Sequence, residues 1–143
     1  MEDLFDLQRF VLAQSKDYES AVAELRAGSK IGHWMWYIFP QIVGLGYSSM
    51  SLRFAIRSLS EAEAYIAHPI LGERLKQCTQ ILLDLHQSNA DEIFGPIDAL
   101  KFRSSMTIFS KCTMRSALFQ GALDYFFNGK PDVKTLKILR HQH

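Results

Sequence analysis

The apolar side chains of this chain recur at spacings of three and four residues along most of its length. The first such series runs from Leu4, Leu7 and Val11 to Leu25, shortly before Gly28. Apolar positions at this period form one face of an α-helix, and a glycine just after the last of them is typical of a helix C-terminus. The pattern therefore predicts a first helix that ends before Gly28.

Local capping signals divide the rest of the chain into further helices. Ser60 and the glutamates that follow it form a capping-box pattern, which predicts a short helix through Ile66. Pro69 suits the first turn of the next helix, where its missing N–H costs nothing, and Asn89 caps a short turn that ends near Gly95. The last three helices are predicted at 97–109, at 115–127 with a stop at Asn128-Gly129, and from Asp132 to Leu139.

Strand patterns are nearly missing from the sequence. Residues 37–42 are the one stretch that could be extended, and residues 40–51 form the least regular part of the chain. We find no internal repeat, low-complexity tract or long linker. The sequence thus predicts an all-α fold, a single compact multihelical domain over residues 1–143.

Composition and charge exclude several classes of partner. The apolar fraction of 48% and the charged fraction of 22% are ordinary for a globular protein. The net charge is +1 and the basic residues form no dense run, so we expect no nucleic-acid partner. Cys78 and Cys112 lack metal-ligand spacing, and we expect neither a metal nor a cofactor. The start lacks a secretion leader and no apolar run is long enough to span a bilayer, which favours a cytoplasmic protein without a membrane partner.

The segment from Lys30 to Gln41 concentrates the chemistry of the chain. It contains both tryptophans, Trp34 and Trp36, together with His33. Indole and imidazole N–H groups need partners when they are buried, so their concentration indicates a shaped, partly polar pocket. An imidazole can exchange a proton near neutral pH, which makes His33 the candidate catalytic residue. The candidate ligand-binding residues of the segment are Lys30, Trp34, Trp36 and Gln41. The alternative is that the aromatic side chains are core and the histidine makes one structural hydrogen bond.

The predicted helix at 97–109 supplies a second set of candidates. At about 100° per residue, Asp98, Lys101 and Ser105 fall in a narrow polar strip with apolar residues on both sides. A lysine in such a strip must reach a partner or line a wet cleft, because an unpaired buried ammonium is costly. Two interpretations stay open. Asp98 is the ion-pair partner of Lys101, or Lys101, Ser104 and Ser105 present a charge and hydroxyls to a phosphate or carboxylate.

Four stretches together resemble a known bacterial family. They are Gly32–Gln41, Gly44-Leu45-Gly46, His68-Pro69-Ile70-Leu71-Gly72 and Lys101–Phe109, and they resemble the family catalogued as domain of unknown function 1810. The resemblance covers nearly the whole chain and implies a compact all-α domain, but no established activity and no catalytic residues. Calpastatin, a name used for some members, does not fit a chain of globular composition, because the inhibitor of that name is largely disordered.

Two functions from different classes are consistent with these residues. In the first, the protein binds a small anionic ligand, nucleotide-like or phosphorylated, in a pocket built by the 30–41 segment and the 97–109 helix. Whether the protein also converts this ligand as an enzyme stays open. Ala99-Leu100-Lys101-Phe102 resembles a motif of enzymes proposed to act on ADP-ribose derivatives, although four residues transfer no activity. In the second, the chain is a non-enzymatic protein-interaction module whose partner the sequence does not identify.

Overall fold

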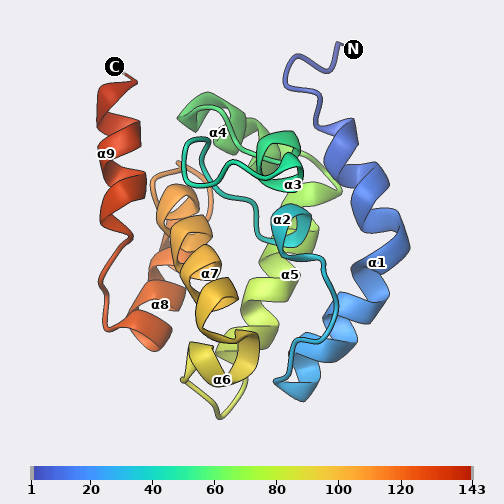
Figure 1. Cartoon of the computed structure of the whole chain (residues 1–143), viewed down its shortest axis with the longest axis vertical. Helices are drawn as coiled ribbons and strands as arrows, with labels where there is room; N and C mark the ends of the chain where they lie inside the picture. The colour runs from blue at the N-terminus through green and yellow to red at the C-terminus, as the bar shows by residue number, and fades with distance from the viewer. Residues whose placement is uncertain (1, 143) are drawn as a thin grey trace.

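Helices make up most of the described part of the chain, residues 2–142, in the computed structural model (Figure 1). In chain order they are α1 (Gln8–Ala27), α2 (Met35–Ile38), α3 (Ser49–Arg53), α4 (Leu59–Ala67), α5 (Leu71–Leu83), α6 (Ala90–Phe94), α7 (Pro96–Ser110), α8 (Ser116–Phe127) and α9 (Val133–His141). Within residues 2–142 no strand forms, and a single isolated bridge joins Ile42 to Ile56. The predicted all-α class is confirmed. The first and last residues of the predicted domain, Met1 and His143, lie outside the described residues.

Helix α7 occupies the middle of the arrangement. It contacts α2, α4, α6, α8 and α9, while α1 and α9 lie at opposite edges of the molecule (Figure 1). Because neighbours cover most of its faces, α7 buries polar as well as apolar side chains. Its Phe102 lies 5.0 Å, between ring centroids, from both Phe39 and Phe94. This aromatic cluster holds the segment that contains α2 against the N-terminal half of α7.

The ends of the first helices test the capping predictions. Gly28 follows α1 in the left-handed conformation (φ 70°), and its N–H donates to the Leu25 carbonyl at 3.0 Å, so the predicted stop is confirmed. The predicted cap at Ser60 is wrong by two residues. Ser58 caps α4 instead, because its hydroxyl accepts from the Glu61 N–H at 3.1 Å.

The turn between α4 and α5 depends on a histidine and a glycine. His68 Nδ1 accepts hydrogen bonds from the Ile70 and Leu71 N–H groups at 3.1 and 3.2 Å, as a capping side chain does. Pro69 therefore precedes α5 rather than lying in its first turn. Gly72 lies so close to the end of α4 that a Cβ atom there would stand 2.0 Å from the Ile66 carbonyl oxygen. The two helices can approach this closely only with glycine at that position.

Residues 35–53 contain more helix than the sequence pattern indicates. Residues 35–38 form α2, so the extended conformation expected for 37–42 is wrong at its start. At its end, Ile42 forms an isolated parallel bridge with Ile56, whose N–H donates to the Gln41 carbonyl at 2.8 Å. Helix α3 follows the glycine loop and is capped by the Ser48 hydroxyl. The loop lies against α9, since a Cβ on Gly44 would meet Ile138 at 3.3 Å. This segment thereby contacts α7 through α2 and α9 through its glycine loop.

Candidate ligand-binding site

The loop between α1 and α2 is held by one carboxylate. Glu24 Oε1 accepts hydrogen bonds from the N–H groups of Ile31 at 2.6 Å and Gly32 at 2.8 Å, and from the Trp34 indole at 3.0 Å. Desolvation by itself favours the neutral acid, but these three donors hold the pKa of Glu24 below its ordinary value. Gly32 is required here because a Cβ would lie 2.8 Å from Trp34 Cδ1. The loop therefore has one defined course toward α7.

The two tryptophans have different environments. Trp34 is 1% exposed and its indole N–H is bound by Glu24, so it is part of the core. Trp36 is half-buried and lines an open hollow. Of the two indoles predicted to face a ligand, only Trp36 borders a hollow. Trp34 is the N-cap residue of α2 and Trp36 lies in its first turn, and side chains two positions apart at a helix start point in different directions.

Three charged side chains meet at the start of α7. Asp98 Oδ2 lies 2.8 Å from Lys30 Nζ, and Asp98 Oδ1 lies 3.3 Å from Lys101 Nζ. Each ammonium also stands over an indole, Lys30 at 5.0 Å from Trp34 and Lys101 at 4.6 Å from Trp36, measured to the ring centroid. One carboxylate is thus shared by two lysines, and Lys30 also interacts with the charge of the Glu24 carboxylate.

The two lysines differ in how fully they are bound. Lys30 also donates to the Gly32 carbonyl, its side chain is 7% exposed, and its backbone N–H donates to Ile93 at 2.8 Å. The Lys101 side chain is 24% exposed, and its contact with Asp98 is the longer one. Lys101 is therefore the ammonium that is free to reach another anion, whereas Lys30 is bound within the protein.

This charged group borders a hollow of about 370 Å³, which we call the first hollow. It is lined by Lys30, His33, Met35, Trp36, Phe94, Gly95, Pro96, Ile97, Asp98 and Lys101. Four of the predicted site residues therefore share one hollow: Lys30, His33, Trp36 and Lys101. His33 is exposed on its wall. The volume of the first hollow lies within the range of small-molecule binding sites.

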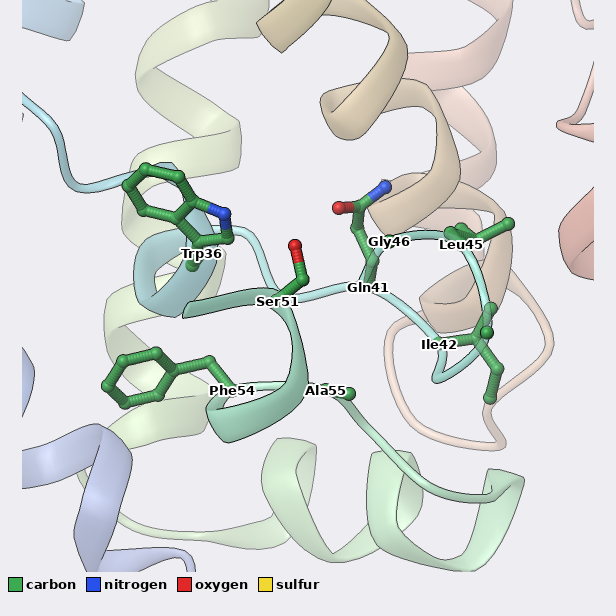
Figure 2. A pocket seen from close by; sticks show the side chains of 9 residues that line it. Trp36, Gln41, Ile42, Leu45, Gly46, Ser51, Phe54 and Ala55 are labelled. Atoms are coloured by element: carbon green, nitrogen blue, oxygen red, sulfur yellow. The ribbon is translucent and has the colours of Figure 1, made fainter. Parts of the chain in front are cut away.

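A second hollow, of about 520 Å³, shares Ile97 and Lys101 with the first. Its lining residues are Gln41, Leu45, Gly46, Ser51, Ile97, Leu100, Lys101, Arg103, Ser104, Pro131, Asp132, Val133 and Lys134. Gln41 and Ser104 thus face this hollow and not the first. A small pocket of about 10 Å³, with room for one water molecule, is lined by both Trp36 and Gln41. Figure 2 shows the Ser51 hydroxyl between the Trp36 indole and the Gln41 amide in this pocket.

The two serines of α7 are both buried. The Ser104 hydroxyl lies 2.8 Å from Thr135 Oγ1, which itself donates to the Asp132 carboxylate at 2.5 Å, so Ser104 serves to hold α9 on α7. Ser105 is 0% exposed and its hydroxyl has no hydrogen-bond partner within the described residues. It borders neither hollow. Of the two serines predicted to contact a ligand, only Ser104 lines a hollow.

The sequence pattern does not indicate several residues that line the first hollow. Phe94, Gly95, Pro96 and Ile97 form its edge where α6 meets α7, and Asp98 links both lysines rather than only Lys101. The Gly95-Pro96 pair was visible as a helix boundary. No local pattern indicates that this boundary faces residues 30–36.

Two wider properties of residues 2–142 bear on function. No three histidine, cysteine, aspartate or glutamate side chains in this range come close enough together to hold a metal ion. None of the helices in the range combines the length and the apolarity that crossing a membrane requires.

These features define a multihelical protein with a charged hollow beside its central helix. The model of the family described as "Protein of unknown function (DUF1810)" matches residues 4–139, and the chain belongs to that family. The crystal structure of the conserved hypothetical protein Rv1873 from Mycobacterium tuberculosis is similar to it, with a TM-score of 0.94 and 47% sequence identity over 96% of this chain and 99% of that one. No curated protein matches. The predicted family is confirmed, and neither description names an activity.

Proposed function

We propose that the first hollow binds a small anionic ligand of nucleotide-like or phosphorylated chemistry. The observation that carries the proposal is the position of Lys101 at the edge of a hollow, where it shares the Asp98 carboxylate with Lys30 and makes the longer of the two contacts. An ammonium that is only partly neutralised and partly desolvated attracts an anion more strongly than a lysine in open water does. The anion binds at Lys101, while Lys30 and Asp98 keep the local geometry.

The surroundings of Lys101 suit a planar group attached to that anion. Its ammonium stands 4.6 Å from the centroid of the Trp36 ring, so an anion at Lys101 and a ring against the indole are neighbours. Phe94, Pro96 and Ile97 add apolar surface to the same hollow. Recognition sites for small molecules commonly combine such apolar walls with a few polar groups.

His33 is the acid–base group in this proposal. It is the histidine that lines the first hollow, and it is exposed there. An imidazole can donate or accept a proton near neutral pH, and proton transfer is the step that hydrolysis or group transfer at a phosphorylated ligand needs. Gln41 lies beyond Trp36 and offers an amide to the part of the ligand that leaves the first hollow.

The test is a thermal-shift titration with inorganic phosphate and adenosine monophosphate. A ligand that binds the folded state raises the unfolding midpoint as its concentration rises. We expect wild type to respond to adenosine monophosphate and Lys101→Gln to respond much less. Lys16→Gln is the matched control, because Lys16 is exposed on α1 away from either hollow. A wild-type midpoint that neither compound moves would contradict the proposal.

Catalysis by His33 needs a separate measurement. Nucleotides and sugar phosphates are incubated with wild type, His33→Gln and the control His86→Gln, and ³¹P NMR follows their turnover. His86 is exposed and lines neither hollow. We expect turnover that disappears in His33→Gln alone. Equal turnover in all three proteins would assign the reaction to other groups.

The second candidate function is a protein-interaction module. The observation in its favour is the exposed apolar side chains that line the hollows, among them Ile97, which is 71% exposed, and Leu100, which is 62% exposed. Under this alternative the Lys30–Asp98–Lys101 group is purely structural. Small anions then leave the unfolding midpoint of wild type unchanged, and Ile97→Glu abolishes capture of a partner protein.

A further inference from the structure

The two hollows meet along one edge of α7. Ile97 and Lys101, one helical turn apart, line both of them. The hollows have volumes of about 370 Å³ and 520 Å³, and Lys101 borders the space of both. A group bound at Lys101 can therefore continue in two directions, toward Trp36 or toward Leu100.

Positive charge gathers along this edge. The charged side chains that line the two hollows are Lys30, Lys101, Arg103, Lys134, Asp98 and Asp132. Asp98 is shared between two lysines, and the Asp132 carboxylate is bound by the N–H and hydroxyl of Thr135. The lining carries two more positive than negative charges, whereas the whole chain carries a net +1. The edge therefore attracts more negative charge than the rest of the surface.

Exposed apolar side chains line the second hollow. Leu100 and Val133 on its rim are 62% and 63% exposed, and Ile97 between the hollows is 71% exposed. Arg103 is held in place because its Nε donates to the Lys130 carbonyl at 2.9 Å and its guanidinium lies over the Phe127 ring. Isolated apolar residues on a surface are ordinary, but three around one charged hollow suit a flat group that carries a negative charge at one end.

We propose that the two hollows bind one elongated ligand, two organic groups joined through a phosphodiester or pyrophosphate linkage that lies at Lys101. One organic group lies against Trp36 in the first hollow, and the other lies against Leu100 and Val133 in the second, within reach of Lys134. This inference rests on the proposed function and narrows its ligand class. A mononucleotide occupies the first hollow and leaves the second one empty.

The test compares a ligand with one organic group and a ligand with two by isothermal titration calorimetry on the full chain. Adenosine monophosphate is the short probe and diadenosine diphosphate is the long one. Leu100→Ser and Lys134→Gln alter the second hollow alone. Their matched controls are Leu12→Ser, at a leucine 61% exposed on α1, and Lys137→Gln, at an exposed lysine of α9 that lines neither hollow.

We expect wild type to bind diadenosine diphosphate about tenfold or more tightly than adenosine monophosphate, because a second ring becomes buried. Leu100→Ser and Lys134→Gln should each weaken binding of the long probe by about two- to fivefold and leave that of the short probe unchanged. The two control variants should bind both probes as wild type does. Lys101→Gln should weaken both probes, since the linkage and the single phosphate use the same ammonium.

The outcomes separate this inference from the proposed function. If adenosine monophosphate binds and diadenosine diphosphate binds no more tightly, the ligand is confined to the first hollow and the elongated class is wrong. The same holds if neither second-hollow variant affects the long probe. If neither probe nor inorganic phosphate binds wild type, the proposed function fails, and this inference fails with it.

Discussion

The Lys30 ammonium lies 2.8 Å from the Asp98 carboxylate, a shorter contact than the 3.3 Å between Asp98 and Lys101 on the same helix. The carboxylate is therefore bound more closely by the lysine that is distant in sequence. That contact ties the loop after α1 to the start of α7. It also leaves Lys101, one turn along α7, as the more available cation beside the first hollow.

This asymmetry predicts different stability losses for the two lysines. Lys30→Met should lower the free energy of unfolding by about 1–3 kcal/mol, because it removes a nearly buried ammonium. Asp98 then keeps Lys101, at 3.3 Å, as its ion-pair partner. Lys101→Met should cost less than about 1 kcal/mol, since its side chain is more exposed. Urea denaturation measures both values. Equal losses would mean that Lys101 is as firmly bound within the protein as Lys30.

Glu24 should make stability depend on pH in the acid range. Its folded-state pKa is lowered, so the unfolded chain takes up a proton first as the pH falls. The stability that this shift contributes is present above the ordinary glutamate pKa of about 4.3 and is lost as the pH falls through the lower folded value. Glu24→Gln keeps an acceptor oxygen and removes the charge.

We therefore expect Glu24→Gln to be less stable than wild type at neutral pH, with a difference that shrinks toward pH 2. Thermal unfolding at a series of pH values measures it, and Glu19→Gln at an exposed position of α1 is the control. A difference that is constant across this range would show that the hydrogen-bond geometry, not the charge, holds the loop.

Gly72 and Gly121 should respond in opposite ways to alanine. A Cβ on Gly72 would stand 2.0 Å from the Ile66 carbonyl oxygen, so Gly72→Ala must separate α4 from α5 and should cost about 2 kcal/mol or more. Gly121 lies in α8 with no atom within 4 Å of an added Cβ, and Gly121→Ala should stabilise by about 0.5–1 kcal/mol. Chemical denaturation of both variants measures the change in the free energy of unfolding. A Gly72→Ala variant more stable than wild type would contradict the close approach of α4 and α5.

The neighbouring serines of α7 provide a second matched pair. Ser104→Ala removes the hydroxyl that binds Thr135 and should cost about 1 kcal/mol, with faster amide hydrogen exchange in α9. Ser105→Ala removes a buried hydroxyl without a partner in residues 2–142 and should be neutral or stabilising by about 1 kcal/mol. Hydrogen exchange read by mass spectrometry, with urea denaturation, tests both. A large loss in Ser105→Ala would reveal a role for that hydroxyl which the fold does not show.

The candidate site was only partly visible in the sequence. Residues 30–41 and the helix at 97–109 do meet, and Lys30, His33, Trp36 and Lys101 line one hollow; their roles toward a ligand stay predictions. Trp34 and Ser105 border no hollow. The two placements have one cause. Neighbouring residues of similar chemistry differ in orientation, and orientation depends on where each helix begins and on what packs against it.

The sequence by itself determined the all-α class and most helix limits, because three- and four-residue periodicity, Gly28 and the Asn89 and Asp132 caps are local features. The family was identified separately, from the resemblance of four stretches of the chain. Only the tertiary structure decided that Asp98 lies closer to Lys30 than to Lys101, and that Lys101 lines two hollows. Periodicity sets which face of a helix is apolar, but it carries no information about which distant segment covers that face. That pairing arises when the aromatic cluster of Phe39, Phe94 and Phe102 packs, since packing brings together residues from separate parts of the chain.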